Sequence, residues 1–123
     1  MKIYETRWFH RWARKERLDD AILRAAAKDV ERGLADALGG FVFKKRVALP
    51  GRGKRGGART LVAFRRGSAA FFIFGYPKNE RANITDREFQ ALRLLAKELL
   101  AYSEQQLLTA LRAGELFEVK EDG

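Results

Sequence analysis

Three short segments in the middle of the chain are rich in β-branched and aromatic residues, which is typical of strands, whereas the segments on both sides have the apolar spacing of α-helices. The strand-like segments are 41–49, 59–66 and 69–76, separated by a glycine-rich loop at 50–58 and by Gly67-Ser68. A strand-rich centre between helical ends constrains the chain to an α+β fold. We therefore predict a small, mostly antiparallel sheet packed against N-terminal and C-terminal helices.

The two later strands have a register that the sequence predicts. A two-residue hairpin loop at Gly67-Ser68 pairs Arg66 with Ala69. The same register pairs Leu61 with Phe74 and Arg59 with Tyr76. Arg59 and Tyr76 are therefore expected to be cross-strand neighbours on one face of the sheet.

In the N-terminal part of the chain, the sequence predicts a strand at 2–5, a helix at 6–16 and a second helix at 20–38. Asp19 has the residue type of an N-cap, and Gly39-Gly40 is expected to end the second helix after a buried Leu34. His10 and the pair Trp8 and Trp12 are interpreted as structural residues on a helix face.

The C-terminal part predicts helices at 86–101 and 104–113. Thr85 with Glu88 and Ser103 with Gln106 have the spacing of capping boxes. Residues 102–123 are expected to complete the core through a helix and a strand, with an acidic arm near the basic segment as the alternative.

The length of 123 residues and the 46% of hydrophobic residues predict one domain over 1–123. The chain has no cysteine and one histidine, so disulfides, cysteine-ligated metals and thiol or histidine-paired catalysis are excluded. We expect no metal and no cofactor. The sequence has neither an apolar run of the ~20 residues that a membrane span needs nor the pattern of a signal peptide, so we expect a cytoplasmic protein without a membrane partner.

Basic residues are concentrated in the centre of the chain. Between Asp36 and Glu80 there are ten basic residues and no acidic one, whereas the other 15 basic and 16 acidic residues nearly cancel. The whole net charge of +9 therefore comes from one segment. Such a concentration favours a polyanionic partner, most often a nucleic acid, over a generally solvated surface.

Several of these cations are expected to converge. Lys44 and Arg46 share one strand face, Arg59 begins the next strand, and Tyr76 and Lys78 end the one after it. Such a group of side chains can cleave RNA without a metal. Attack of a ribose 2′-hydroxyl on its own phosphate needs a base, stabilisation of the phosphorane charge and a proton for the leaving 5′-oxygen. An arginine suits the phosphate because its fork matches two phosphate oxygens.

The runs KKRVALPGRGKRGGARTLVAFRRG at 44–67 and FGYPKNERANI at 74–84 resemble the RelE/HigB-like toxins of type II toxin–antitoxin modules, within the RelE/ParE superfamily. The resemblance covers residues from about 1 to 101. It implies a small α+β toxin that enters the ribosomal A site and cleaves mRNA. It also implies a cognate antitoxin, usually with a helix-turn-helix DNA-binding domain, as the partner.

The resemblance also implies roles for individual residues. Arg59 matches the arginine that contacts the scissile phosphate, Lys44 and Arg46 match a basic pair that includes the proposed base, and Lys78 matches the lysine of the later motif. Asn79 stands where related toxins have an arginine implicated as general acid. Thr85 or a nearby residue stands where they have a catalytic tyrosine, for which Tyr76 is the candidate substitute. Further residues expected to bind RNA or phosphate are Lys45, Arg52, Lys54, Arg55, Asn79 and Arg81.

Two other functions remain open from the sequence. One is a ParE-like topoisomerase poison, which does not require a surface lined by cations. The other is a basic RNA-binding module without catalysis. Transcript cleavage distinguishes the endoribonuclease from both alternatives.

Overall fold

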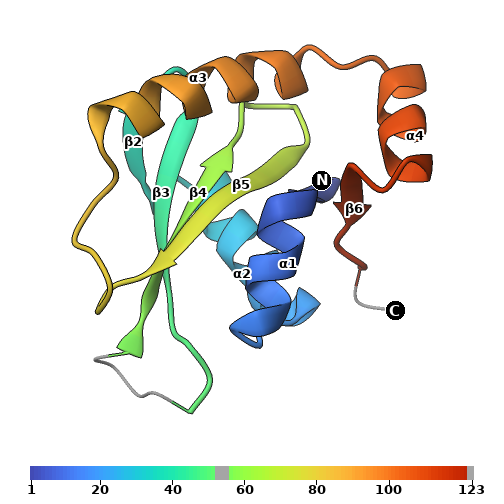
Figure 1. Ribbon diagram of the computed structural model, residues 1–123. Helices are drawn as coiled ribbons and strands as arrows, with labels where there is room; N and C mark the ends of the chain where they lie inside the picture. Colours follow the sequence, from blue (N-terminus) through green and yellow to red (C-terminus); the bar gives the residue numbers. More distant parts are fainter. Residues whose placement is uncertain (52–55, 122–123) are drawn as a thin grey trace.

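The computed structural model describes residues 1–51 and 56–121, and this part of the chain forms one six-stranded sheet with helices on both faces (Figure 1). In chain order the elements are β1 (Ile3–Thr6), α1 (Arg7–Lys15), α2 (Asp20–Glu31), β2 (Asp36–Gly39), β3 (Val42–Val47), β4 (Ala58–Ala63), β5 (Ala70–Pro77), α3 (Asp86–Leu100), α4 (Glu104–Arg112) and β6 (Leu116–Glu118).

The strand order is β2-β3-β4-β5-β1-β6. The pairing of β1 with β5 is parallel, and the other four pairings are antiparallel in the described part of the chain. The predicted α+β class with an antiparallel-rich sheet is therefore confirmed.

Each face of the sheet has its own apolar core. Helices α1 and α2 cover one face, where Phe9, Leu23 and Phe72 are fully buried. Helices α3 and α4 cover the other face, where Leu61, Leu92 and other apolar side chains pack together. Burial of apolar side chains on both faces explains why β4 and β5 read as nearly continuous apolar segments instead of alternating ones.

The prediction of one helix over 20–38 is wrong. Helix α2 ends at Glu31, and Gly33 follows its C-cap with a φ of +82°. The N–H groups of Gly33 and Leu34 donate to the carbonyls of Val30 and Asp29, which is the hydrogen-bond pattern of a Schellman motif. Leu34 is exposed, and the residues after it form the edge strand β2, which pairs with β3.

The predicted register of β4 and β5 is correct at its outer end and wrong at the turn. Arg59 lies opposite Tyr76 and Leu61 opposite Phe74, as expected. The register then shifts by one residue after Leu61. Strand β4 ends at Ala63 and strand β5 begins at Ala70, so the two strands are not joined by a two-residue loop. Arg65 and Ser68 make the turn instead, and the Ser68 N–H donates to the Arg65 carbonyl at 2.8 Å.

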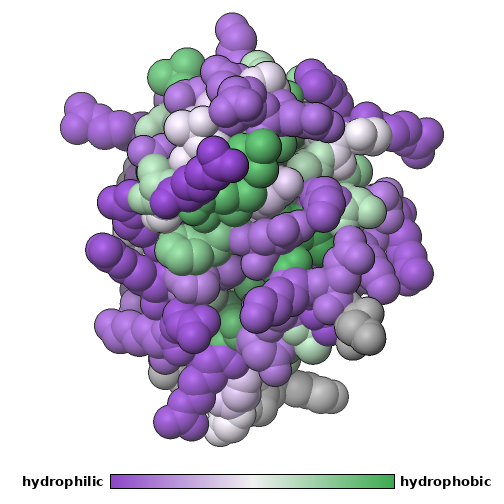
Figure 2. Space-filling model, turned by 90° about the vertical axis from the view of Figure 1, so that its right-hand side faces the viewer, coloured by the Kyte–Doolittle hydropathy of each residue, from purple (hydrophilic) through white to green (hydrophobic). Residues whose placement is uncertain are grey.

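Both predicted capping boxes are present, at the N-termini of α3 and α4. Strand β6 adds to β1, and Leu116 and Val119 are buried, so this part of the chain completes the core as expected. On the side that carries α4 and β6, hydrophilic side chains surround small apolar patches (Figure 2). None of the helices in residues 1–51 and 56–121 is both long enough and apolar enough to cross a bilayer.

Candidate nucleic-acid interface

Three predicted site residues form a row across the sheet at the end that lies away from α3. Arg46 on β3 is paired with Arg59 on β4, and Arg59 is paired with Tyr76 on β5. Neighbouring strands are about 4.8 Å apart, so the three Cα atoms lie within roughly 10 Å. The sheet therefore places two guanidinium groups and one phenol on one face.

Two lysines extend this row. Lys44 lies two residues before Arg46 on the same strand, opposite Leu61. Lys78 directly follows β5, and its backbone N–H donates to the Gly57 carbonyl at 2.9 Å. This hydrogen bond holds the end of β5 against the start of β4. We call Lys44, Arg46, Arg59 and Lys78 together the cationic face.

Across the described part of the sheet, most of the cationic face lacks an acidic neighbour, although Asp36 on β2 lies opposite Lys44. None of its four side chains forms an ion pair with a residue in 1–51 or 56–121, and Arg46 and Lys78 are exposed. Two like charges directly opposite each other on neighbouring strands are destabilising. A bound anion removes this repulsion, so the arrangement is suited to a phosphate chain.

Tyr76 is buried beneath the segment that connects β5 to α3. The guanidinium of Arg81 lies over its ring, 5.3 Å from the centroid, and Tyr76 as a whole is 3% exposed. Arg81 forms a bidentate ion pair with the Glu88 carboxylate, in which Nη1 donates to Oε2 at 3.0 Å and Nη2 donates to Oε1. Glu88 also caps α3 by accepting from the Thr85 N–H at 2.8 Å, so this connection is fixed to the start of the helix.

The Tyr76 hydroxyl is buried and has no hydrogen-bond partner among the described residues. Burial raises the pKa of Tyr76, although the nearby charges of Arg59 and Arg81 act in the opposite direction. Tyr76 therefore carries its proton at neutral pH. The hydrogen bonds from Arg81 and Thr85 lower the pKa of Glu88 to about 2, so this carboxylate is ionised and neutralises Arg81.

Other residues expected to bind RNA lie apart from this row or outside the described residues. Lys45 points to the opposite face, where its ammonium lies 3.0 Å from the Asp29 carboxylate. Asn79 is exposed in the connection after β5. Arg52, Lys54 and Arg55 lie outside the described residues. The pairing of Arg81 with Glu88 was not predicted from the sequence, although the capping box at Thr85 already placed Glu88 close to this connection.

The described residues contain no group of three or more His, Asp or Glu side chains arranged to hold a metal ion. The cationic face and Tyr76 offer positive charge and a phenol. They can bind phosphate oxygens, stabilise developing negative charge and exchange protons.

A comparison with known protein families finds a match that extends over residues 1–119. The matching family is described as the RelE toxin of the RelE/RelB toxin–antitoxin system. The match includes α4 and β6, which lie beyond the motifs that carry the resemblance in the sequence. No curated protein sequence matches the chain.

Proposed function

We propose that this chain, which belongs to the RelE toxin family, acts as a ribosome-dependent endoribonuclease on mRNA. Membership of the family makes it a toxin of a toxin–antitoxin system with an antitoxin as its partner. The proposed antitoxin is of the helix-turn-helix type. The proposed reaction is metal-independent. The 2′-oxygen of one ribose attacks the adjacent phosphorus, the bond from phosphorus to the 5′-oxygen breaks, and the products are a 2′,3′-cyclic phosphate and a 5′-hydroxyl.

The observation that carries this proposal is the pairing of Arg46 with Arg59 beside Tyr76, without an acidic partner in the described residues. Arg59 sits at the centre of the row, with one strand on either side. Its guanidinium is the group that we assign to the scissile phosphate. A bidentate contact there stabilises the extra negative charge of the phosphorane.

The remaining roles follow from which groups can exchange a proton. Lys44 is the member of the Lys44 and Arg46 pair that can accept the 2′-hydroxyl proton, because an arginine side chain stays protonated. Arg46 then contributes charge. Two groups are available to protonate the leaving 5′-oxygen, namely the exposed Lys78 and the protonated phenol of Tyr76.

The position of Arg81 separates these two proton donors. Tyr76 reaches a bound RNA only if the Arg81 side chain leaves its ring, which requires the contact with Glu88 to break. Lys78 needs no such movement. We therefore assign the leaving-group proton to Lys78 and a positioning role to Tyr76.

The test is cleavage of a defined mRNA by the purified protein, with and without ribosomes programmed with that mRNA. We expect cuts only when the ribosome is present, and 5′-hydroxyl ends on the downstream fragments. Lys28→Ala removes an exposed lysine on α2, away from the cationic face, and serves as the control variant that should still cut the mRNA. Intact transcripts together with DNA breaks in treated cells would instead indicate a topoisomerase poison.

A further inference from the structure

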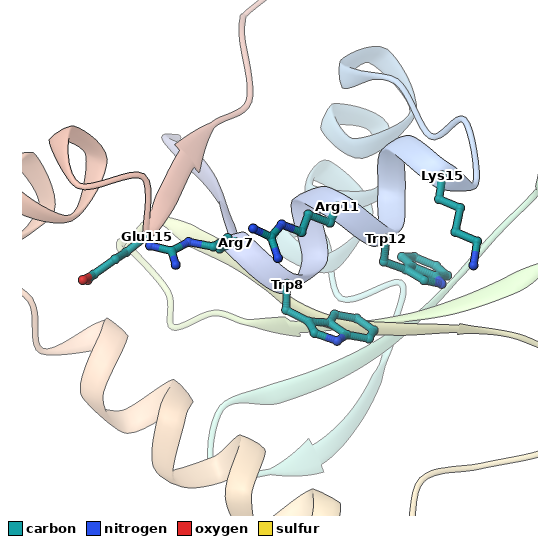
Figure 3. A pocket seen from close by; sticks show the side chains of 6 residues that line it. All are labelled: Arg7, Trp8, Arg11, Trp12, Lys15 and Glu115. Atoms are coloured by element: carbon teal, nitrogen blue, oxygen red, sulfur yellow. The ribbon is translucent and has the colours of Figure 1, made fainter.

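A second surface with aromatic and basic side chains lies along the outer side of α1. A hollow of about 680 Å³ is lined there by side chains from successive turns of the helix (Figure 3). These residues are Arg7, Trp8, Arg11, Trp12 and Lys15, together with Glu115 from the segment before β6. The proposed cleavage of mRNA does not use any of these six residues.

The two tryptophans of this hollow have different roles. Trp12 packs against β5 so closely that a Cβ added at Gly75 would lie 2.4 Å from its ring, which makes Trp12 part of the fold. Trp8 stacks one side of its ring on Phe74, with the centroids 4.6 Å apart and the planes at 22°. Trp8 nevertheless remains 48% exposed. Trp12 is therefore a packing residue, whereas Trp8 both packs on Phe74 and presents surface to a ligand.

The aromatic side chains connect this hollow to the cationic face. Phe74 lies between the two, with its ring centroid 4.6 Å from that of Trp8 and 6.3 Å from that of Tyr76. Tyr76 in turn is paired with Arg59 across the sheet. Helix α1 packs on the sheet face opposite the cationic face. A ligand that contacts both Trp8 and Arg59 must therefore pass around the edge of β5 beyond its pairing with β1 and across Arg81, which covers Tyr76.

Two cations of the hollow are available to a ligand. Arg7 is engaged, because its Nε donates to the Gly114 carbonyl at 2.9 Å. Arg11 and Lys15 are exposed and form no ion pair with the described residues. They are one helical turn apart, about 6 Å along the axis, on the same side of α1 as Trp8. The carboxylate of Glu115 points away from both indoles (Figure 3).

We propose that this hollow binds a single-stranded segment of the same RNA whose scissile phosphate lies on the cationic face. A base of this segment stacks on Trp8, and Arg11 and Lys15 contact its phosphates. This inference rests on the proposed function, because it takes RNA as the substrate. An exposed indole beside two free cations matches a nucleotide, which supplies a flat ring and a phosphate together. An acidic peptide matches only the cations.

The test is the affinity for a 2′-O-methyl oligouridylate of about 12 nucleotides, which lacks the attacking hydroxyl. Fluorescence anisotropy of the labelled RNA measures binding. We expect Trp8→Ala to weaken binding at least about fivefold, since this is the lower end of what stacking on one base contributes. Trp8→Phe keeps an aromatic ring and should keep most of the affinity. Arg11→Glu should weaken binding and flatten its salt dependence.

Lys28→Glu makes the same change of charge at an exposed position on α2 and should leave the affinity close to that of the wild type. Thermal melting of each variant checks that it is folded. Wild-type affinity of both Trp8→Ala and Arg11→Glu would overturn the proposal. Displacement of the RNA by an oligoglutamate peptide that depends equally on Trp8 would also overturn it, in favour of an acidic protein partner.

The same variants separate this inference from the proposed function. If the wild type fails to cut mRNA on ribosomes but binds the oligonucleotide in a Trp8-dependent way, cleavage is wrong and the RNA site stands. If the wild type cuts mRNA and Trp8→Ala neither weakens binding nor slows cutting, the hollow is not part of the RNA path.

Discussion

The guanidinium of Arg81 lies 5.3 Å from the ring centroid of Tyr76 and is held there by the Glu88 carboxylate. This contact closes the β5–α3 connection over the last row of the sheet. It buries a phenol next to Arg59, whereas Arg46 and Lys78 remain exposed. The candidate site therefore lies along the sheet, and one of its five proposed residues, Tyr76, is covered by the protein itself.

Arg59→Ala should abolish most mRNA cleavage while leaving the melting temperature nearly unchanged. A contact made mainly to the transition-state phosphate is worth roughly 3–4 kcal/mol, or about 10²–10³ in rate. Arg59→Lys should not restore the rate, because a point charge cannot form the bidentate contact. Single-turnover cleavage on programmed ribosomes measures the rate, and thermal melting of the same samples measures stability. A large drop in melting temperature would mean that Arg59 is structural.

Tyr76→Phe should melt at or above the wild-type temperature. The hydroxyl is buried without a partner in the described residues, and removing such a group recovers a desolvation cost of about 1 kcal/mol. The aromatic ring and its contact with Arg81 remain. Cleavage by this variant at close to the wild-type rate would agree with the assignment of Lys78 as the proton donor, whereas complete loss of cleavage would assign that role to Tyr76.

Glu88 should make the protein sensitive to acid. Its pKa is about 2 in the folded state and 4.5 in the reference state, so folding favours the ionised carboxylate. This contribution to stability is complete above pH 4.5 and is lost as the pH falls towards 2. Glu88→Gln keeps a residue type suited to the capping box and lacks the charge. Urea unfolding from pH 7 to pH 2 should therefore show a smaller loss of stability below pH 4.5 for the variant than for the wild type.

Gly75→Ala should destabilise the fold by about 1–3 kcal/mol, because the added methyl group overlaps the Trp12 ring. Replacing Trp12 with leucine in the same chain should recover part of this loss. The free energies of unfolding of the two single variants and the double variant measure the coupling between the two positions. Additive effects would show that Trp12 and Gly75 do not restrict each other.

RNA binding should weaken steeply as salt concentration rises, because cations on phosphates release counterions. Arg46→Glu should reduce the slope of log affinity against log salt, whereas Lys45→Glu should change it less, because Lys45 lies on the opposite face and is paired with Asp29. Binding of labelled single-stranded RNA over a range of salt concentrations measures both slopes. Equal slopes for the two variants would contradict the assignment of the cationic face.

Local hydrogen-bonding motifs were predictable from sequence because all their partners lie within a few residues. Thr85 with Glu88 and Ser103 with Gln106 form the expected capping boxes, and Asp19 caps α2 by accepting from the Ile22 N–H at 3.0 Å. The end of α2 was missed because Leu34 continues the apolar spacing of the helix. Gly33 ends the helix instead, and the following residues gain backbone hydrogen bonds by pairing with β3.

Strand period alone predicts which residues alternate on β3. The pairing of Arg59 with Tyr76 was predicted from a two-residue loop that the chain does not form, and it is the register shift after Leu61 that brings these two residues opposite each other. Which face of each strand is covered depends on how the helices pack on the sheet. Residues far apart in the chain come together there, as when β1 joins β5 and β6, when Arg81 covers Tyr76, and when α1 places Trp8 on Phe74. Such contacts depend on how the layers pack, and no local pattern in the sequence specifies them.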